Sequence, residues 1–427
     1  MEQYQSEFVR SLMERGYHYQ ATDLAGLDAA AAKGGLTGYV GFDCTAPSLH
    51  VGSLVQIMLL RRLQQAGGRP IVLLGGGTSK IGDPSDKDKA RPVLSEAAIQ
   101  ANKESLKAVF SRFLRFDDSA TGALMVDNAG WLDGLGYIEF LRGVGRFFSI
   151  NRMIALESVK RRLDREQEMS FLEFNYMLLQ AYDFWELNQR YNCRLQMGGS
   201  DQWGNIVNGR ELIRKIKAER QGQERAEEKA FGFTAPLITT ASGSKMGKTA
   251  DGAVWLNADL RSPYEYWQFW RNCEDADVGR FMRLFTDLPL DEIASFEALQ
   301  GAGINTAKIA LANTCTKMLH GPEAAAQAEQ TARATFEQGG TGAALPHVRL
   351  SQADMDQGIA LVALVERAGL VDTRGEAKRH IKAGALKLND EAVRDVQQRI
   401  SSRDFCGRDA LKLSVGRKKH ALVLPAP

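Results

Sequence analysis

Short β-branched runs alternate with helical patterns over residues 38–238, and this alternation constrains the fold more than any other feature of the sequence. The runs YVGFD, PIVLL, ALMVD and CRLQMGG have the length and composition of buried strands. Residues 53–65, between the first two runs, have a helical pattern. Such alternation predicts a mostly parallel, doubly wound sheet with helices on both faces. Ligands bind such sheets beyond the carboxyl ends of the strands, so we expect chemistry after YVGF, IVLL and RLQM.

The rest of the chain divides by composition. Residues 262–335 show helical patterns without clear strands, and EQGGTGAALP has the small residues of a linker. We therefore expect a catalytic domain at 1–240, a lysine loop and helical domain at 241–336, a linker at 337–346 and a carboxyl-terminal domain at 347–427. The last domain carries 15 Lys and Arg against 10 Asp and Glu, which favours a polyanionic partner over a merely solvated surface.

Several classes of protein are excluded by what the sequence lacks. It contains no uncharged apolar run of about 18 residues, and MEQYQSEFVR lacks the pattern of a signal peptide, so we expect a cytoplasmic protein without a membrane span. The five cysteines form no C-x-x-C pair, and the six histidines lack metal-ligand spacing. We expect neither a disulfide framework nor a protein-bound metal.

Two glycine-containing segments have the character of phosphate sites. CTAPSLHVGS leads from a predicted strand into a helix, where free N–H groups and the helix dipole favour anions, and His50 can donate there. GSKMGKT places Lys245 and Lys248 three residues apart in a loop that can close over phosphates. Taken singly, the histidine could be a helix cap and the lysine loop a solvated surface.

A polar stripe marks the predicted helix at residues 170–185. Tyr176, Gln180 and Asp183 are spaced i, i+4 and i+7, so they share one face, while most of the remaining circumference is apolar. A helix this apolar is buried, and buried polar groups need partners. The stripe therefore predicts either a substrate pocket or an internal hydrogen-bond network.

Four motifs taken together resemble one family. HVGS and KMGKT are similar to the two signature motifs of class I aminoacyl-tRNA synthetases. YVGFDCTAPSLHVGS, GDPSDK, FNYMLLQAYDF and GGSDQWGN closely resemble the bacterial-type tyrosyl-tRNA synthetases, over most of the chain. The resemblance implies a Rossmann-like α/β catalytic domain, a helical domain and a small α+β S4-like RNA-binding domain.

For the amino acid, the resemblance implies a tyrosine pocket. Tyr39 and Asp183 would contact the phenolic hydroxyl, which phenylalanine lacks, and tyrosyl-tRNA synthetases are themselves the standard example of such discrimination. The ammonium group would lie among other polar residues, and Gln202 would lie near the bound tyrosine. The implied ammonium-side residues are Tyr176, Gln180 and Asp83.

For ATP, the resemblance implies a binding surface and a set of mobile cations. The implied ATP-binding residues are Gly41, Asp43, His50, Gly52, Ser53, Asp201 and Lys248. The residues implied to stabilise the phosphates during reaction are His50, Lys245, Lys248, Thr249, Lys87 and Arg91. ATP would bring Mg²⁺ with it.

Two positions depart from the family pattern. Ser53 stands where the first motif commonly ends in histidine, which puts its contact with the ATP ribose in doubt. Gly247 stands where the second motif commonly has serine, which removes a hydroxyl and adds freedom to the loop. The remaining charged residues of both motifs keep their positions, so we expect activity.

In the tail, Arg374, Lys378 and Lys382 recur at i, i+4 and i+8 on a predicted helix that is followed by a short strand. This basic stripe resembles the S4-type RNA-binding module, whose natural partner is structured RNA. The alternative is a solvated helix face. The family also implies a homodimer, with residues 137–154 as a candidate contact surface.

The predicted function is that of a tyrosine-tRNA ligase, which activates L-tyrosine with ATP and transfers it to tRNA(Tyr). One alternative is another nucleotidyltransferase of this fold, or the tryptophan-specific relative, which would not need the pair Tyr39 and Asp183. Another is a catalytically silent RNA-binding protein that uses the basic tail. Amino-acid-dependent release of pyrophosphate discriminates among these.

Overall fold

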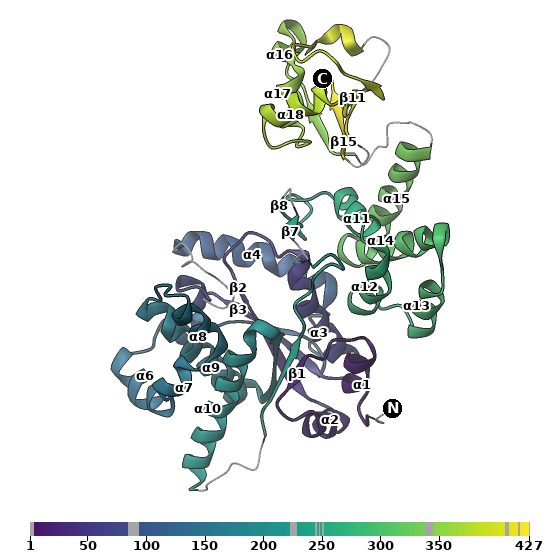
Figure 1. Cartoon of the computed structure of the whole chain (residues 1–427). Coiled ribbons are helices and arrows are strands. Elements are labelled where there is room, and N and C mark those ends of the chain that lie inside the picture. Colours follow the sequence, from purple (N-terminus) through teal and green to yellow (C-terminus); the bar gives the residue numbers. More distant parts are fainter. Residues whose placement is uncertain are drawn as a thin grey trace. The chain divides into compact units, whose positions relative to one another are not determined.

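A six-stranded sheet organises the amino-terminal part of the molecule (Figure 1). We describe a computed structural model, and the residues described are 4–83, 94–222, 229–243, 246, 248–249, 252–337, 345–405, 410–416 and 419–426. The strand order is β1-β6-β5-β2-β3-β4, parallel throughout except for β1 at one edge. The strands are β1 (Gln20–Ala21), β2 (Thr37–Asp43), β3 (Arg69–Gly75), β4 (Leu124–Asp127), β5 (Cys193–Gly199) and β6 (Phe231–Ala235).

The order of these strands creates a switch point beside β2. From β2 the chain builds β3 and β4 on one side, then returns to build β5 and β6 on the other. The predicted doubly wound parallel sheet is thus confirmed, as are the four strands that we expected. In a sheet of this kind the crevice at the switch point, beyond the strand ends, is where ligands bind.

The helices that cover this sheet pack their apolar faces against it, and α9 begins with a capping box. α3 (Leu54–Gln65) packs on β2 and β3, while α9 (Phe171–Tyr191) and α10 (Trp203–Gln221) pack on each other and on β5. Ser170 caps α9 in a capping box with Glu173. The other helices in this part are α1 (Glu7–Glu14), α2 (Leu24–Ala32), α4 (Glu96–Phe113), α5 (Ala129–Leu132), α6 (Tyr137–Gly143), α7 (Ile150–Ile154) and α8 (Glu157–Asp164).

Residues 262–337 are helical, as predicted, in the part of this stretch that the structure describes. α11 (Pro263–Arg271) packs on α15 (Pro322–Glu337), and the Trp267 indole N–H donates to Asn313 of α14 (Ile304–His320) at 2.7 Å. The remaining helices here are α12 (Val278–Phe285) and α13 (Leu290–Glu297), and two short strands, β7 (Lys248–Thr249) and β8 (Gly252–Ala253), precede them.

The carboxyl-terminal part is a small α+β fold with its own apolar core. Its main sheet has the order β12-β11-β14-β15-β9. The predicted basic helix is present as α18 (Arg374–Lys382), and the strand expected after it is β11 (Leu386–Leu388). The other elements are β9 (His347–Arg349), α16 (Gln352–Gln357), β10 (Ile359–Ala360), α17 (Leu361–Arg367), β12 (Glu391–Ala392), β13 (Arg399–Ile400), β14 (Leu411–Val415) and β15 (Lys419–Leu424).

By its contacts the chain forms two compact units. The first comprises Met1–Thr249, Ala253–Leu260 and Cys273–Ala307, and the second comprises Ala250–Gly252, Arg261–Asn272 and Lys308–Pro427. The domain boundaries at residues 240, 336 and 346 stay predictions. No helix in the described part of the chain is long and apolar enough to cross a membrane.

Candidate active site

A cavity of about 470 Å³ lies at the carboxyl ends of β2, β3 and β5, where the sheet topology predicts a ligand. Its wall includes Asp43 at the end of β2, Gly75 at the end of β3 and Gly198 near the end of β5. Helix α9 contributes its polar stripe. The predicted residues that line the cavity are Tyr39, Gly41, Asp43, His50, Gly52, Ser53, Asp83, Tyr176, Gln180, Asp183, Asp201 and Gln202.

Asp183 is a buried carboxylate held by two side-chain donors. The Asn128 amide donates to one oxygen at 2.9 Å, and the Trp131 indole N–H donates to the other at 2.8 Å. Burial raises the pKa of Asp183 to about 7, against the opposing effect of these two hydrogen bonds. Sequence analysis missed both donors, although Asn128 directly follows β4 and the strand-end rule could have found it.

Tyr39 faces the same cavity and is only 1% exposed. Its hydroxyl has no hydrogen-bond partner in the part of the chain that the structure describes, and the same holds for the side-chain oxygen of Gln196 on β5. Burial, with the nearby charge of Asp183, raises the pKa of the Tyr39 phenol well above its usual value, so the phenol keeps its proton. Both atoms border the cavity, so a polar group inside it, of a ligand or of water, can become their partner.

A second chain of hydrogen bonds joins Asp43 to the stripe on α9. The Tyr176 hydroxyl donates to Asp43 at 3.2 Å, and the Thr78 hydroxyl donates to the other carboxylate oxygen at 2.9 Å. Asn128 donates its second amide hydrogen to Thr78 at 3.0 Å, so it connects Asp43 with Asp183. Burial is the main cause that raises the pKa of Tyr176.

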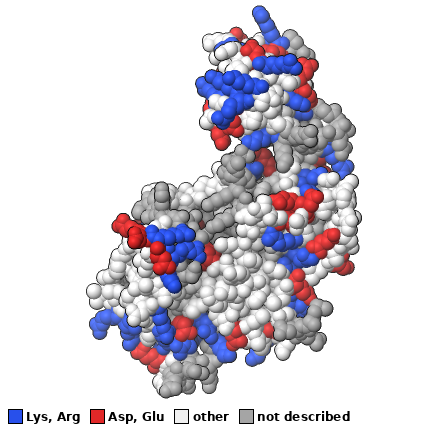
Figure 2. Space-filling model, in the orientation of Figure 1, with Lys and Arg blue, Asp and Glu red and all other residues white. Residues whose placement is uncertain are grey.

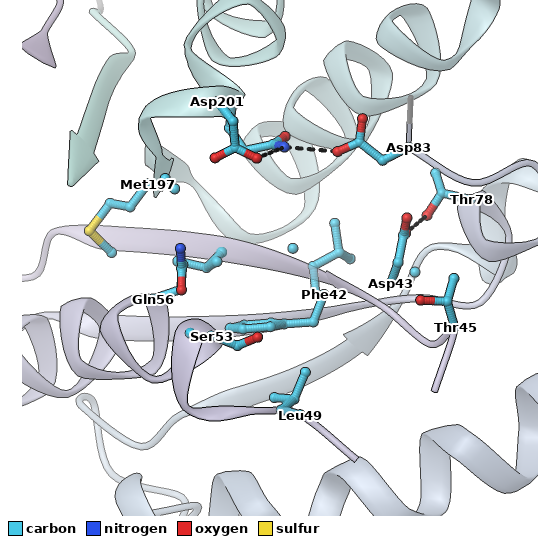
Figure 3. Close-up of a pocket in the computed structure, with 18 of the residues that line it drawn as sticks. Phe42, Asp43, Thr45, Leu49, Ser53, Gln56, Thr78, Asp83, Met197 and Asp201 are labelled. Carbon is cyan, nitrogen blue, oxygen red and sulfur yellow. Dashed lines mark hydrogen bonds between the residues drawn. The ribbon is translucent and has the colours of Figure 1, made fainter. Parts of the chain in front are cut away.

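Gln202 lies between two carboxylates (Figure 3). Its amide nitrogen lies 2.8 Å from Asp83 and 3.2 Å from Asp201, and its oxygen accepts from Gln180 at 3.2 Å. Asp43 also lines the cavity, so three carboxylates border it. Such a concentration of negative charge suits an ammonium group.

His50 caps the short helix at Val51–Ser53, where its Nδ1 accepts from the Gly52 N–H at 3.0 Å. A side chain at Gly52 would place its Cβ 2.7 Å from the His50 ring and 2.9 Å from the Met246 carbonyl oxygen, so the close packing there requires glycine. His50 also forms an antiparallel bridge with Trp255. The first motif therefore borders the segment that contains and follows the lysine loop.

The basic residues predicted to act on phosphates cannot be placed in the same way. Lys87, Arg91 and Lys245 lie outside the described residues, as do the side chains of Lys248 and Thr249. The described residues of the loop include Met246, which lines the cavity together with Trp255. Further lining residues that sequence analysis missed are Thr45, Thr78, Asn128 and Gln196.

The predicted RNA-binding stripe lies on the surface of the carboxyl-terminal part. Arg374, Lys378 and Lys382 are all exposed on α18, and Figure 2 shows basic side chains gathered over the position of this helix. Arg374 forms an ion pair of 2.8 Å with Glu366, whereas Lys378 and Lys382 extend the stripe toward the end of the helix. This surface is separate in sequence from every residue that lines the cavity.

Comparison with known proteins agrees with the geometry. The family described as tRNA synthetases class I (W and Y) matches residues 32–337, and the S4 domain matches residues 361–406. The chain is 57% identical to the tyrosine-tRNA ligase of Caulobacter vibrioides, covering 99% of this chain and 98% of that protein. It is 55% identical to the tyrosine-tRNA ligase of Rhodopseudomonas palustris, covering 99% of each.

A solved structure supports the same assignment. A C-terminally truncated mitochondrial tyrosyl-tRNA synthetase of Aspergillus nidulans superposes with a TM-score of 0.70 at 31% identity, covering 77% of this chain and 94% of that one. Identity above half over nearly the full length, together with both domain matches, settles the family. The chain belongs to the tyrosine-tRNA ligases, the tyrosine-specific members of the class I aminoacyl-tRNA synthetases.

Proposed function

We propose that the cavity at the ends of β2 and β5 binds L-tyrosine and ATP and is where this ligase forms tyrosyl-adenylate. The observation that carries the proposal is the pair Tyr39 and Asp183, a buried donor without a partner beside a buried acceptor. A phenolic hydroxyl satisfies both at once, because it donates to a carboxylate and accepts from a hydroxyl. Phenylalanine would enter the same space and leave the Tyr39 hydroxyl without a partner, and it would add no donor for Asp183 to those of Asn128 and Trp131, so phenylalanine is disfavoured.

At the other end of the substrate, the ammonium group would lie among Tyr176, Gln180 and Asp83. The phenol oxygen of Tyr176 and the amide oxygen of Gln180 can accept from an ammonium, and Asp83 supplies the charge. Gln202, which bridges Asp83 and Gln180 by hydrogen bonds, would hold these groups in register. The tyrosine carboxylate is then left pointing away from both recognition ends, free to react.

ATP would lie against the strand ends and the first motif. Gly41, Asp43 and Gly52 would present backbone to the phosphates, with His50 beside them and Ser53 at the start of α3. Asp201 would face the ribose. The cations that we assign to the leaving pyrophosphate are Lys245, Lys248, Lys87 and Arg91, together with the hydroxyl of Thr249.

Mg²⁺ fits this site as part of the substrate. Among the described residues, no group of three or more His, Cys, Asp or Glu side chains could hold a metal ion. Mg²⁺ commonly binds through substrate phosphates with few protein ligands, so ATP would carry it into the cavity. Bound there, it would neutralise part of the phosphate charge.

The chemistry is a transfer in two steps without a protein nucleophile. A carboxylate oxygen of tyrosine attacks the α-phosphorus of ATP in line, and the bond to the pyrophosphate oxygen breaks. A terminal ribose hydroxyl of the tRNA then attacks the tyrosyl carbonyl carbon, and AMP leaves. Catalysis would come from the positioning of the two substrates and from positive charge at the phosphates.

The remaining assignments concern partners and location. We assign tRNA binding in the carboxyl-terminal part to Arg374, Lys378 and Lys382, since exposed cations on one helix face neutralise RNA phosphates. We also place the protein in the cytoplasm, where tyrosine, ATP and tRNA(Tyr) meet.

We further propose a symmetric homodimer through the surface around α6, α7 and the start of α9. Tyr137, Ile138 and Ile150 are 58%, 66% and 58% exposed, and Phe171 is 68% exposed. Large apolar side chains gathered on one surface mark a protein interface. Light scattering at working concentration should give twice the mass of the chain, and a monomer would contradict the proposal.

The deciding experiment is amino-acid-dependent exchange between ATP and pyrophosphate by the purified protein, without tRNA. Tyrosine should support exchange, whereas phenylalanine and tryptophan should not. Exchange with tryptophan instead would disprove the pocket assignment and keep the fold. If no amino acid supports exchange by folded protein, the cavity has another role.

A further inference from the structure

Asn257 lies in the segment that follows the lysine loop, and its side chain contacts two other parts of the first compact unit. The Ser48 hydroxyl donates to Asn257 Oδ1 at 2.7 Å, and the Asn257 backbone N–H donates to the same hydroxyl oxygen at 3.1 Å. On its other side, Asn257 Nδ2 donates to Ser105 Oγ at 2.7 Å. One amide therefore joins residues that lie 209 and 152 positions away in the sequence.

The contact with Ser48 belongs to a larger connection with the first motif. Ser48 stands two residues before His50, and the chain on either side of His50 pairs with residues 254–256. The Val51 N–H donates to the Val254 carbonyl, and the Leu256 N–H donates to the Leu49 carbonyl, both at 2.9 Å. A displacement of the segment around Asn257 would therefore be transmitted to His50.

The contact with Ser105 extends the connection to α4. This helix is joined to the turn before the first motif a second time, because the Asn102 amide donates to the Cys44 carbonyl at 2.8 Å. The chain that enters α4 contains Lys87 and Arg91, whose own placement lies outside the described residues. Asn257 thus joins the turn before His50 to α4, and the segment that contains Asn257 follows the lysine loop in the sequence.

We propose that Asn257 is a positioning residue for adenylate formation. Its side chain links α4 to the turn that leads to His50, and its own segment pairs with the chain on either side of His50. The described residues that line the cavity include Ser48 but not Asn257, so in this proposal Asn257 acts through Ser48 and its other neighbours. The inference rests on the proposed function of the cavity.

The chemistry of the contacts selects the test variants. In Asn257→Asp the new carboxylate keeps the shape, accepts from Ser48 and can accept from Ser105, because a serine hydroxyl donates as well as accepts. In Asn257→Leu the volume is similar but both side-chain hydrogen bonds are lost. The Ser48 hydroxyl then retains an acceptor in the Leu49 carbonyl at 2.8 Å, so the substitution leaves no unpaired donor there.

The experiment measures tyrosine-dependent ATP–pyrophosphate exchange and, separately, the affinity for tyrosine. Asn257→Leu should lower kcat about tenfold while the Kd for tyrosine changes by less than about twofold, because only the phosphate side is displaced. Asn257→Asp should restore most of kcat. Ser105→Ala should give part of the loss, and the double variant Ser105→Ala/Asn257→Leu should be no slower than Asn257→Leu alone.

Three results would overturn the role of Asn257. They are an unchanged kcat in Asn257→Leu, equal losses in Asn257→Asp and Asn257→Leu, and, should Asn257→Leu fold poorly, an unchanged kcat in Ser105→Ala. If the wild-type protein showed no tyrosine-dependent exchange, that result would instead contradict the proposed function, on which this inference rests. The two failures are therefore distinguishable.

Discussion

Asp183 combines two properties that rarely occur together, deep burial and a position open to a ligand. Its side-chain oxygens accept from Asn128 and Trp131, yet the carboxyl group still borders the cavity. The two donors orient the carboxylate, so that little reorganisation is needed when a phenol binds. In the proposed function, selectivity for tyrosine would depend on a carboxylate whose orientation is fixed before the substrate binds.

Replacement of this carboxylate should abolish recognition while the fold survives. We expect Asp183→Ala to lower kcat/KM for tyrosine by about 100-fold or more, because the phenol loses its charged acceptor. Glu186→Gln is the matched control, a carboxylate one turn along α9 that pairs with Arg190 instead of the ligand. Exchange kinetics with thermal unfolding of both variants test this, and unchanged activation by Asp183→Ala would refute the pocket assignment.

The affinity for tyrosine should depend on pH through the same residue. The ionised form of Asp183 is the stronger acceptor for the phenol proton, and burial raises the pKa of this group to about 7. Affinity should therefore rise as pH increases from about 6 to about 8, and selectivity over phenylalanine should rise with it. Calorimetric titrations across this range test the expectation, and an equal pH dependence in Asp183→Asn would contradict it.

At the residue scale, spacing predicted that Tyr176, Gln180 and Asp183 share one face of a buried helix, and the family resemblance supplied their role in a tyrosine pocket. It could not predict Trp131, whose indole reaches Asp183 only through the packing of α5 against α9. Partners that meet through tertiary packing leave no periodic trace in a sequence.

Among the elements, helix α9 is stabilised at its first turn by side-chain hydrogen bonds and an ion pair. Glu173 completes the capping box with Ser170 and also pairs with Arg162 at 2.7 Å, with both side chains nearly buried at 7% and 8% exposed. This pairing lowers the pKa of Glu173 in spite of burial. The helix that carries the polar stripe is therefore anchored to α8 at its start.

Removal of the ion pair between Glu173 and Arg162 should destabilise the first compact unit. Glu173→Gln leaves the Arg162 charge buried without a counterion, so we expect a loss of about 3 kcal/mol in unfolding free energy. Glu186→Gln, which breaks a more exposed pair on the same helix, should cost less than about 1 kcal/mol. Scanning calorimetry compares the two variants, and equal shifts in Tm would show that the buried ion pair stabilises the protein no more than the exposed one.

The elements differed in how far the sequence could predict them. YVGFD and CRLQMGG consist mostly of buried residues, and both are strands in the structure. The helix predicted at 170–185 continues to Tyr191, because no breaker occurs before Asn192, which adopts the left-handed conformation with φ 49°. FGFTA was not predicted as a strand, since five residues with an internal glycine give little pattern on their own.

At the scale of the whole molecule, activation and RNA binding should be separable. Lys378→Glu/Lys382→Glu reverses two exposed charges on α18. We expect the KM for tRNA in aminoacylation to rise about tenfold, while exchange without tRNA is unchanged. Lys33→Glu, at an exposed position beside α2, is the control for charge reversal elsewhere. Loss of exchange in the tail variant would contradict the separation.

The strand order also has a consequence for synthesis on the ribosome. β2 pairs with β3 on one edge soon after translation, but its other edge waits for β5, which begins at Cys193. Until then the nascent chain displays an open, apolar strand edge, the kind of surface that pairs with wrong partners. A product that stops between β4 and β5 therefore has an aggregation-prone strand edge and lacks the wall of the cavity that β5 provides.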